Sequence, residues 1–508
     1  MGFEAFKELW SRRDAQGRRK YDVVLLQRPS AKNKALFKPY ELESGIEPCR
    51  GKGVVEGGGF KIVWGDATDP GDLEEACRGV DWILCPMAFI SPAADRDPAM
   101  AKAVNADAIK AMIETVEAQP DGPERVRFVQ VGTVAATGDR LGEIHVGRVG
   151  DPLKPSVFDF YATTKIAGER AILESNIRRW VVLRQTFIMI PDLMSLQDPI
   201  LFHQPLATFM ENNTARDAGR GLVNCLDVPD DSDFWRRVYN MGGGPSCRIT
   251  FYEFLKRIYG MLGVDHRKVM ERRWFALRNF HMQYFEDSAV LNEYLHNWGD
   301  TMEDYFRQVW KALPWHLKLV AKLNGLLPPL RWAVERATRR RLEALARAPE
   351  GTLRWYESRN DARITAFYGS YEAYEDIPGW DDDPPPAPER EPAWRRLDHG
   401  YDETKETLDL GDLKKAAEFR GGRCEANAWS GDLYERVAWS CARGHRFEAR
   451  PYTILKAGHW CPECAPPPWR YDEEARLNPF FAQVWYPNHS RDEDNFYPED
   501  CFKDVLDP

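Results

Sequence analysis

The sequence predicts an α/β fold with a mostly parallel sheet, and three consecutive segments carry this prediction. The apolar run 126–131 has the length and composition of a strand, and it leads into a loop at 132–139 that contains glycine and threonine. Residues 162–175 follow as a predicted helix, because Ala, Lys, Glu, Arg and Leu dominate and no proline interrupts them. Residues 180–184 form a second apolar strand. A unit of this kind gathers its polar residues at the carboxyl ends of parallel strands.

Tyr161 and Lys165 share one face at the start of the predicted helix, because they are four positions apart. The spacing alone is a weak signal, since three other pairs repeat it: Tyr252/Lys256, Tyr401/Lys405 and Tyr452/Lys456. The first pair differs in its surroundings, because a strand and a hydroxyl-bearing loop precede it and a strand follows it. A surface helix with an ordinary tyrosine and lysine is the alternative interpretation, and we prefer that interpretation for the other three pairs.

These residues resemble the extended short-chain dehydrogenase/reductase family. In that family a Ser or Thr follows the fifth strand five residues before a glycine, as Thr133 precedes Gly138, and a Tyr-x-x-x-Lys motif comes later. The resemblance covers residues 2–265 and implies a doubly wound, Rossmann-like sheet with an α-rich substrate half. It also implies that Tyr161 is the proton donor and acceptor, that Lys165 tunes it and holds the nicotinamide ribose, and that Thr133 orients the substrate oxygen.

The chemistry explains why these residue types occur together. A phenol titrates near pH 10 in water, which is too high for proton exchange at neutral pH. A lysine ammonium a few ångströms away favours the phenolate and can lower this pKa by about 1–3 units. A threonine hydroxyl can hold the substrate oxygen that gains or loses the proton.

The beginning of the chain departs from the family pattern. Residues 2–13 resemble the family's first helix and residues 21–28 its second strand, but the first strand and the glycine turn that cradles the pyrophosphate are absent. Gly2 would be the last glycine of that turn. A sheet without its central strand exposes two strand edges. We expect a sequence that was started late, and a damaged fold is the alternative.

Further cofactor contacts follow from the resemblance. Arg28 ends the second strand, where an arginine can pair with the 2′-phosphate of NADP, and Lys32 and Lys34 reinforce this; a solvated basic loop is the alternative. The resemblance places four more residues along the cofactor or beside it: Asp66 at the adenine, Ala88 in the loop after the fourth strand, Gln185 near the nicotinamide, and Asn105 in a mainly structural role. Helix capping by Asp66 or Asp69 is a rival interpretation. We expect NADP, with NAD as the alternative cofactor.

Composition bounds the remaining possibilities. The 508 residues suffice for several domains, no run of about 18 uncharged apolar residues predicts a membrane span, and the N-terminus lacks the features of a signal peptide. The net charge of −10 argues against a general nucleic-acid binder. Ten cysteines in so long a chain do not predict a disulfide scaffold, and a reducing cytoplasm is the simplest compartment.

The expected organisation has five parts. We expect a cofactor-binding domain at 1–191 with parts of 215–250, a substrate-binding region at 192–330, a helical extension at 331–379, a linker at 380–400 and a metal-binding module with an aromatic tail at 401–508. The helices after 303 break at Pro314 and Pro328, and the basic helix 331–347 is expected to pack as a lid, with a membrane-surface role as the alternative. The aromatic tail at 478–487 is expected to dock back on the protein.

The aromatic content of the substrate region admits two explanations. Phe, Trp, Tyr and Met recur there, including Phe202, Phe209, Trp235, Trp274, Phe280 and Met282. A small apolar or aromatic substrate would suit this composition. A plain hydrophobic core explains the same residues more often.

The tail contains a second specific motif. Cys441-x3-His445 and Cys461-x2-Cys464 supply four ligands of the kind that suits a tetrahedral structural zinc, with Cys424 and His459 as rival ligands. The segment resembles zinc-ribbon modules. Because so small a module has little apolar core, we expect it to unfold on chelation while the α/β part persists.

The sequence therefore predicts an NADP-dependent oxidoreductase that interconverts a carbonyl and a secondary alcohol, with a homodimer as a compatible assembly. A sugar-nucleotide epimerase is the first alternative, because it uses the same three groups. Dehydration is disfavoured, since Val134 and Ala135 stand where the family's dehydratases carry Asp-Glu. A non-catalytic scaffold protein with a degenerate Rossmann half is the alternative from another class.

Overall fold

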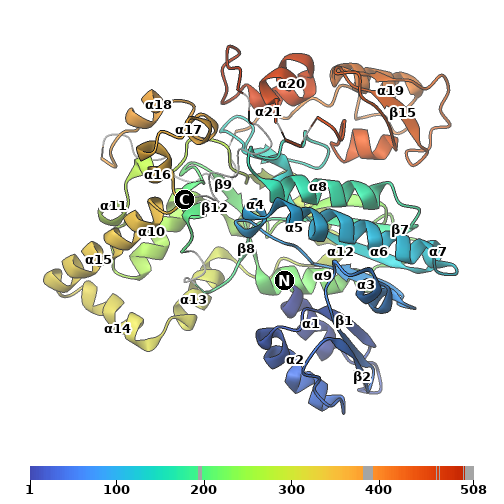
Figure 1. The fold of residues 1–508 in the computed structure, drawn as a ribbon, viewed down its shortest axis with the longest axis horizontal. Helices are drawn as coiled ribbons and strands as arrows, with labels where there is room; N and C mark the ends of the chain where they lie inside the picture. The colour runs from blue at the N-terminus through green and yellow to red at the C-terminus, as the bar shows by residue number, and fades with distance from the viewer. Residues whose placement is uncertain (193–196, 382–392, 465, 468, 496, 498–508) are drawn as a thin grey trace.

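The computed structural model describes residues 1–192, 197–381, 393–464, 466–467, 469–495 and 497, and its centre is a four-stranded parallel sheet (Figure 1). The strands run in the order β11-β7-β5-β4, and every neighbouring pair is parallel. Their bounds are β4 (Trp82–Cys85), β5 (Arg127–Thr133), β7 (Arg179–Gln185) and β11 (Arg237–Met241). The two central strands are almost wholly buried, which explains their continuous apolar sequences.

Helices cover both faces of this sheet. On one face, α6 (Ala108–Glu117) and α8 (Phe160–Leu173) enclose a core with Phe128 and Trp180. On the other face, α1 (Gly2–Ser11), α9 (Ala215–Asn224) and α12 (Ser288–Leu295) enclose Val129 and Val181. The predicted α/β, doubly wound fold class is therefore confirmed. Helix α8 begins two residues earlier than expected, because Asp159 caps it by accepting a hydrogen bond from the amide of Ala162.

A second, separate sheet lies at the N-terminal end. Strand β1 (Val23–Gln27) pairs in parallel with β3 (Phe60–Trp64), which pairs antiparallel with β2 (Gly53–Gly57). Among the described residues β1 and β4 each pair with another strand on one side only. These are the two free strand edges expected of a sheet that lacks the family's first strand. Helix α1 joins the two sheets, because Ala5 packs on the four-stranded sheet and Phe6 and Trp10 pack on the smaller one.

The region after β7 is largely helical and has an aromatic core. Strand β9 (Phe209–Glu211) pairs antiparallel with β12 (Arg248–Thr250), and α10 (Phe251–Met261) follows. Phe202, Trp274 and Met282 lie in this core, so core packing accounts for much of the aromatic content noted in the sequence. Three prolines mark the breaks expected in the following helices: α13 (Met302–Ala312) ends before Pro314, and α15 (Pro328–Ala346) begins with two prolines.

The remaining elements are short helices and strands, with bounds α2 (Ala31–Glu43), α3 (Pro70–Cys77), α4 (Ala93–Arg96), α5 (Pro98–Lys102), α7 (Gly122–Arg125), β6 (Val146–Gly147), β8 (Ile188–Met189), β10 (Asn213–Thr214), α11 (His266–Val269), β13 (Tyr284–Phe285), α14 (Trp315–Asn324), α16 (Thr352–Glu357), α17 (Asp361–Tyr368) and α18 (Tyr371–Glu375).

The C-terminal module contains α19 (Leu410–Phe419) and an antiparallel sheet of β14 (Arg423–Cys424), β15 (Val437–Ser440) and β16 (Arg446–Ala449). Two tail helices follow, α20 (Tyr471–Leu477) and α21 (Pro479–Trp485). Much of the expected linker, 382–392, lies outside the described residues.

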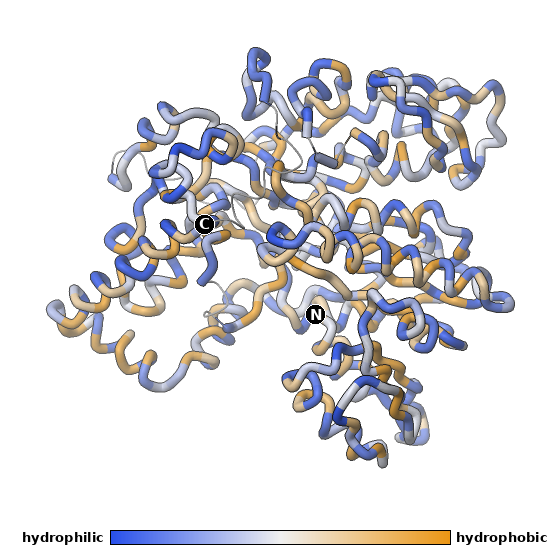
Figure 2. The backbone as a smooth tube through the Cα atoms, in the orientation of Figure 1, coloured by the Kyte–Doolittle hydropathy of each residue, from blue (hydrophilic) through white to orange (hydrophobic). Residues whose placement is uncertain are grey.

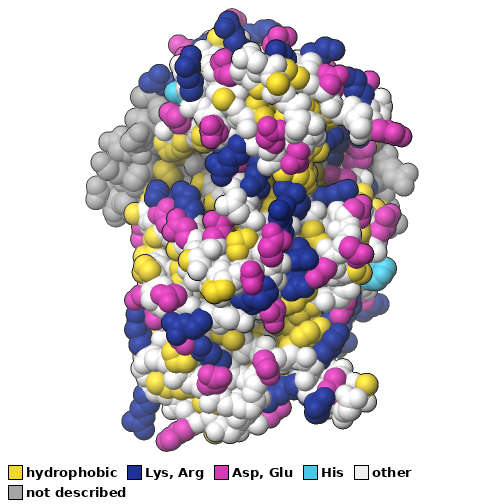
Figure 3. Space-filling model, turned by 90° about the vertical axis from the view of Figure 1, so that its right-hand side faces the viewer, with side chains coloured by type: hydrophobic (Ala, Val, Ile, Leu, Met, Phe, Trp, Pro, Cys, Tyr) yellow, Lys and Arg dark blue, Asp and Glu magenta, His cyan; other side chains and the backbone are white. Residues whose placement is uncertain are grey.

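The module docks directly on the α/β domain. The Tyr452 hydroxyl accepts a hydrogen bond from the amide of Val238 in β11 at 2.9 Å, and Arg170 of α8 donates to the carbonyl oxygen of Trp460 at 2.6 Å. Lys and Arg side chains gather along the hollow between the module and the body (Figure 3). The aromatic tail packs against the start of α8 and the segment before it, because Phe481 and Trp485 share a buried core with Phe158 and Phe160.

Candidate functional site

Thr133 and Tyr161 meet at the carboxyl edge of the parallel sheet. Thr133 is the last residue of β5, where its hydroxyl accepts a hydrogen bond from the amide of Ala135 at 3.1 Å and so begins the following turn. Tyr161 lies in the first turn of α8, and its hydroxyl is near enough to the Thr133 hydroxyl for Thr133 to influence the pKa of the phenol. The strand end and the helix start thus bring together two of the three residues predicted to be catalytic.

The electrostatic state of Tyr161 differs from the one expected. Burial raises the pKa of Tyr161 to about 12, the hydrogen bond from Thr133 opposes this rise, and the nearby Asp159 carboxylate adds to it. Lys165 is not among the groups that shift the pKa of this phenol. In this state the phenol is protonated at neutral pH and can donate a proton.

Lys165 lies one turn further along α8 and points into the sheet. Its ammonium donates to the carbonyl oxygen of Val131 in β5 at 2.6 Å, and the side chain is almost completely buried. Burial lowers the pKa of Lys165, with Cys85 and Glu169 opposing the shift. The lysine is therefore held beside the central strand by a main-chain oxygen.

The other three Tyr-x-x-x-Lys pairs are engaged elsewhere. The Tyr252 hydroxyl lies 3.2 Å from His266, the Tyr401 hydroxyl donates to the carbonyl oxygen of Leu455 at 3.2 Å, and the Tyr452 hydroxyl accepts from β11. These contacts are structural, as the sequence analysis supposed.

Sequence reasoning missed a half-buried carboxyl pair beside Tyr161. Asp95, in α4, accepts a hydrogen bond from the amide of Phe160 at 3.0 Å, and Asp159 is the N-cap of α8. Burial raises the pKa of Asp95 to about 8, and Asp159 contributes to the rise. His281 lies 3.6 Å from Asp159. The capping position of Asp159 was readable from the sequence, whereas only the fold brings Asp95 and His281 to it.

The residues expected to bind the cofactor line two strand ends. Arg28 follows β1 and is exposed, and its guanidinium is near enough to Asp66, after β3, to contribute to the lowered pKa of that carboxyl. The largest cause of that shift is the amide of Thr68, which donates to Asp66. Asp69, not Asp66, caps α3. Lys32 is exposed at the start of α2.

The five other predicted residues have different environments. Lys34 lies 3.9 Å from the centre of the Trp64 ring and donates to the carbonyl oxygen of Gly51, so it is already engaged. Gly2 begins α1 close to Pro86 at the end of β4. Ala88 is exposed in the loop after β4, and the Gln185 amide donates to the carbonyl oxygens of Thr186 and Met241. Asn105 fastens that loop by two hydrogen bonds to the main chain of Phe89 and one to Thr164, which is a structural role.

A cavity of about 350 Å³ lies on the other side of α8, between this helix and the C-terminal module. Thr163, Ile166 and Arg170 of α8 line it together with Trp460 and Phe480. Positions 163, 166 and 170 project from a different face of the helix than positions 161 and 165. The cavity is therefore separate from the Tyr161 site.

No family model matches the chain, and no curated relative matches it. The chain is similar to many solved structures, of which three are described here. It resembles a UDP-glucuronic acid 4-epimerase from Bacillus cereus in complex with NAD, at 15% identity over 61% of this chain and 95% of that chain, with a TM-score of 0.41. It resembles a UDP-Glc/GlcNAc 4-epimerase from Campylobacter jejuni at 14% identity over 64% and 96%, with a TM-score of 0.44. It also resembles a short-chain dehydrogenase/reductase superfamily protein from Agrobacterium tumefaciens with bound NAD, at 16% identity over 57% and 97%, with a TM-score of 0.39.

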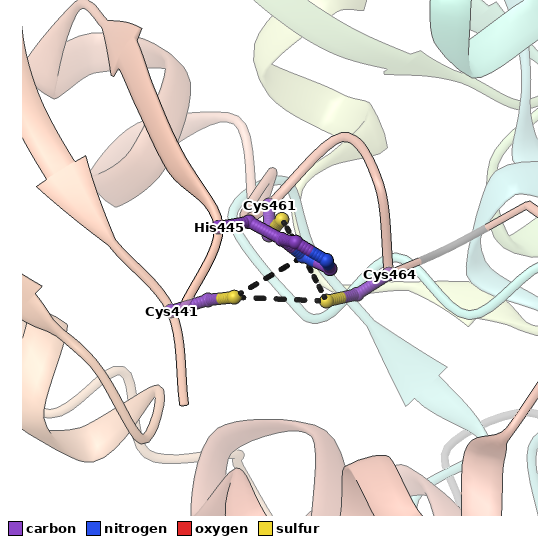
Figure 4. A group of neighbouring side chains, drawn as sticks. All are labelled: Cys441, His445, Cys461 and Cys464. Atoms are coloured by element: carbon purple, nitrogen blue, oxygen red, sulfur yellow. Dashed lines mark hydrogen bonds between the residues drawn. The ribbon is translucent and has the colours of Figure 1, made fainter. Parts of the chain in front are cut away.

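The four residues predicted as metal ligands form one cluster (Figure 4). The ligand atoms of Cys441, His445, Cys461 and Cys464 all lie within 4.8 Å of one another. His445 Nδ1 is 3.4 Å from the sulfur atoms of Cys441 and Cys461 and 3.5 Å from that of Cys464, and the Cys441 and Cys464 sulfurs are 3.9 Å apart. Ligand atoms of a tetrahedral zinc site are separated by about 3.5–3.8 Å. The cluster could thus hold a four-coordinate metal ion.

The two rival ligands are excluded from this cluster. Cys424 is buried in the apolar core of the module with Leu413 and Trp439. His459 directs Nε2 to the Glu169 carboxylate of α8 at 2.8 Å. With four protein ligands in place, the cluster leaves no open position for a substrate in tetrahedral coordination.

Proposed function

We propose that this protein is an NADP-dependent oxidoreductase that interconverts a carbonyl compound and a secondary alcohol. The observation that carries the proposal is the juxtaposition of Thr133 and Tyr161 at the carboxyl edge of the sheet, with Lys165 one turn further along the same helix. In this proposal the Tyr161 hydroxyl gives a proton to the substrate oxygen or takes it back, and the Thr133 hydroxyl orients that oxygen.

A bound nicotinamide cofactor would supply or accept the hydride. Arg28 and Lys32 fit its 2′-phosphate, because both are exposed and neither forms an ion pair with a described residue. Asp66 would contact the adenine, and Gly2, Ala88, Gln185 and Lys165 would line the remainder. Lys165 has hydrogen-bonding capacity left beyond Val131, since an ammonium donates three hydrogen bonds.

Zinc is the metal we propose for the Cys441 cluster, because three thiolates and one imidazole are a usual ligand set for structural zinc. Its role is structural in this proposal. No step of the redox chemistry involves it.

Turnover by Tyr161→Phe tests the oxidoreductase proposal. The variant keeps the ring and removes the titrating proton, so turnover of carbonyl substrates with NADPH should fall about a hundredfold or more while cofactor binding is retained. Tyr252→Phe is the matched control, because Tyr252 has the same spacing to a lysine but contacts His266. Equal activity of the two variants would show that Tyr161 is not the catalytic acid.

One observation favours a second function, binding or scaffolding without turnover. Lys165, which would tune the phenol, donates to the carbonyl oxygen of Val131 and is not among the groups that shift the pKa of Tyr161. Titration with NADPH separates the two functions. Saturable binding supports the oxidoreductase, whereas no binding by the folded protein favours the scaffold.

A further inference from the structure

The helical hairpin of α14 and α15 exposes an unusual concentration of large apolar side chains. It projects at the lower left of Figure 1, and Figure 2 shows apolar segments along it. Five large apolar side chains on α14, the connecting turn and the start of α15 are between 48% and 76% exposed: Trp315, Leu319, Leu326, Leu327 and Trp332. Burying side chains of this kind is favourable, so leaving five of them in water points to a binding surface.

Packing within the hairpin does not explain this exposure. Trp315 and Leu319 are four positions apart on the outward face of α14, while Ala321 and Asn324 face inward. The Asn324 side chain donates to the carbonyl oxygen of Leu262 at 3.0 Å. On α15, Leu342 and Ala346 belong to the core of the substrate region. The inner faces are therefore already anchored, and this anchoring presents the outer faces to solvent.

The hairpin also carries exposed cations that have no acidic partner among the described residues. Lys322, Arg336, Arg340 and Arg341 are exposed, and none of them forms an ion pair with a described residue. The nearby Glu335 is buried, and it pairs with Arg331 at 2.8 Å. The hairpin thus concentrates positive charge in a chain whose net charge is −10.

We propose that the α14–α15 hairpin docks on the surface of an anionic lipid bilayer. Tryptophan prefers the interface between headgroups and acyl chains, leucine inserts below it, and unpaired Lys and Arg bind anionic headgroups. An anionic bilayer can bind both the exposed apolar side chains and the unpaired cations of the hairpin, because its apolar layer lies directly beneath its negatively charged headgroups. The excess negative charge elsewhere on the chain would be repelled from the same surface and would orient the protein with the hairpin inward. No helix in the described parts of the chain is long and apolar enough to cross a membrane, so the contact we propose is interfacial.

Co-sedimentation of the full chain with lipid vesicles tests the proposal. We expect binding to phosphatidylcholine vesicles that contain about 30% phosphatidylserine, and at least tenfold weaker binding to pure phosphatidylcholine. Raising the salt concentration should weaken binding. The double variant Trp315→Ala/Trp332→Ala should lose the interaction while the unfolding transition is unchanged, because both side chains are exposed.

A charge variant tests the second feature independently. Lys322→Gln/Arg336→Gln/Arg340→Gln should reduce partitioning onto anionic vesicles by about a hundredfold, since each cation near such a surface contributes about 1 kcal/mol. Leu42→Ala is the matched control, because Leu42 is 57% exposed on α2, outside the hairpin, and its loss should change nothing. Absence of binding, or equal binding to neutral and anionic vesicles, would overturn the proposal. Salt-insensitive self-association that Trp315→Ala/Trp332→Ala abolishes, without vesicle binding, would instead assign the surface to a second copy of the chain.

Discussion

His459 Nε2 lies 2.8 Å from Glu169 Oε1 in the protein interior, and this contact joins residues 290 positions apart. Glu169 also accepts two hydrogen bonds from Arg184 of β7, at 2.6 and 3.1 Å, and Arg184 donates to the carbonyl oxygen of Ala457 at 2.7 Å. Burial alone would raise the pKa of Glu169, but Arg184 and His459 outweigh it and hold this pKa at about 2. The module therefore completes a buried ionic network that reaches the central sheet.

Glu169→Gln should lower the free energy of unfolding by about 3–5 kcal/mol, because it leaves the buried Arg184 without a countercharge. His459→Ala should cost less, about 1–3 kcal/mol, since Arg184 still pairs with Glu169. Urea denaturation measures both changes. Glu114→Gln, at an exposed position on α6, is the control. A change below about 1 kcal/mol in Glu169→Gln would mean that the network contributes little to stability.

Metal content should depend on Cys461 and not on Cys424. Purified protein should carry about one zinc per chain, Cys461→Ser should lose it, and Cys424→Ser should keep it, because only Cys461 lies in the ligand cluster. Elemental analysis gives the metal content. Loss of zinc in Cys424→Ser but not in His445→Ala would move the fourth ligand to Cys424.

Chelation should also lower the melting temperature of the α/β domain, because unfolding of the metal-binding segment uncovers Glu169 and Arg184. The docking thus argues against our expectation that the domain persists unchanged without the module. Calorimetry with and without a chelator decides between these two expectations. An unchanged melting transition of the α/β domain would show that the domain is stable independently of the module.

The stability of the protein should depend on the protonation of Asp95. The pKa of Asp95 is about 8 in the folded protein against 3.8 ordinarily, so the folded state holds a proton that the unfolded chain has released. The free energy of unfolding should therefore receive a contribution that is fully present below about pH 4 and is lost as the pH rises to about 8. Asp95→Asn should flatten this part of the pH profile, and the exposed Asp231→Asn should not. Identical profiles for wild type and Asp95→Asn would contradict the shift.

Arg28 should govern cofactor preference. If its exposed guanidinium pairs with the 2′-phosphate, NADPH should bind better than NADH, and Arg28→Ala should remove about 1–3 kcal/mol of that preference. Isothermal titration with both cofactors measures it. Lys38→Ala is the control. Lys38 is also basic and exposed but lies on α2, so its loss should leave the preference for NADPH intact. Equal affinity of the wild-type protein for NADPH and NADH would show that Arg28 does not bind the 2′-phosphate.

The local pattern of the sequence predicted the parallel α/β core and the two halves of the Cys441 cluster, whereas the resemblance to a known family predicted that Thr133 and Tyr161 lie together. Apolar runs of strand length, the spacing of Tyr161 and Lys165, and the Cys-x3-His and Cys-x2-Cys spacings each act within a few residues, so they could be read without the fold.

Only the tertiary structure decided contacts between segments that are distant in the chain. It placed Asp95 against α8, directed Lys165 to Val131, paired His459 with Glu169 rather than with the Cys441 cluster, and left the outer face of the α14–α15 hairpin uncovered. Each of these results depends on which group pairs with a buried charge and on which apolar face is covered by another element. Contacts between distant segments determine these pairings and this coverage, and local residue type and spacing do not encode such contacts.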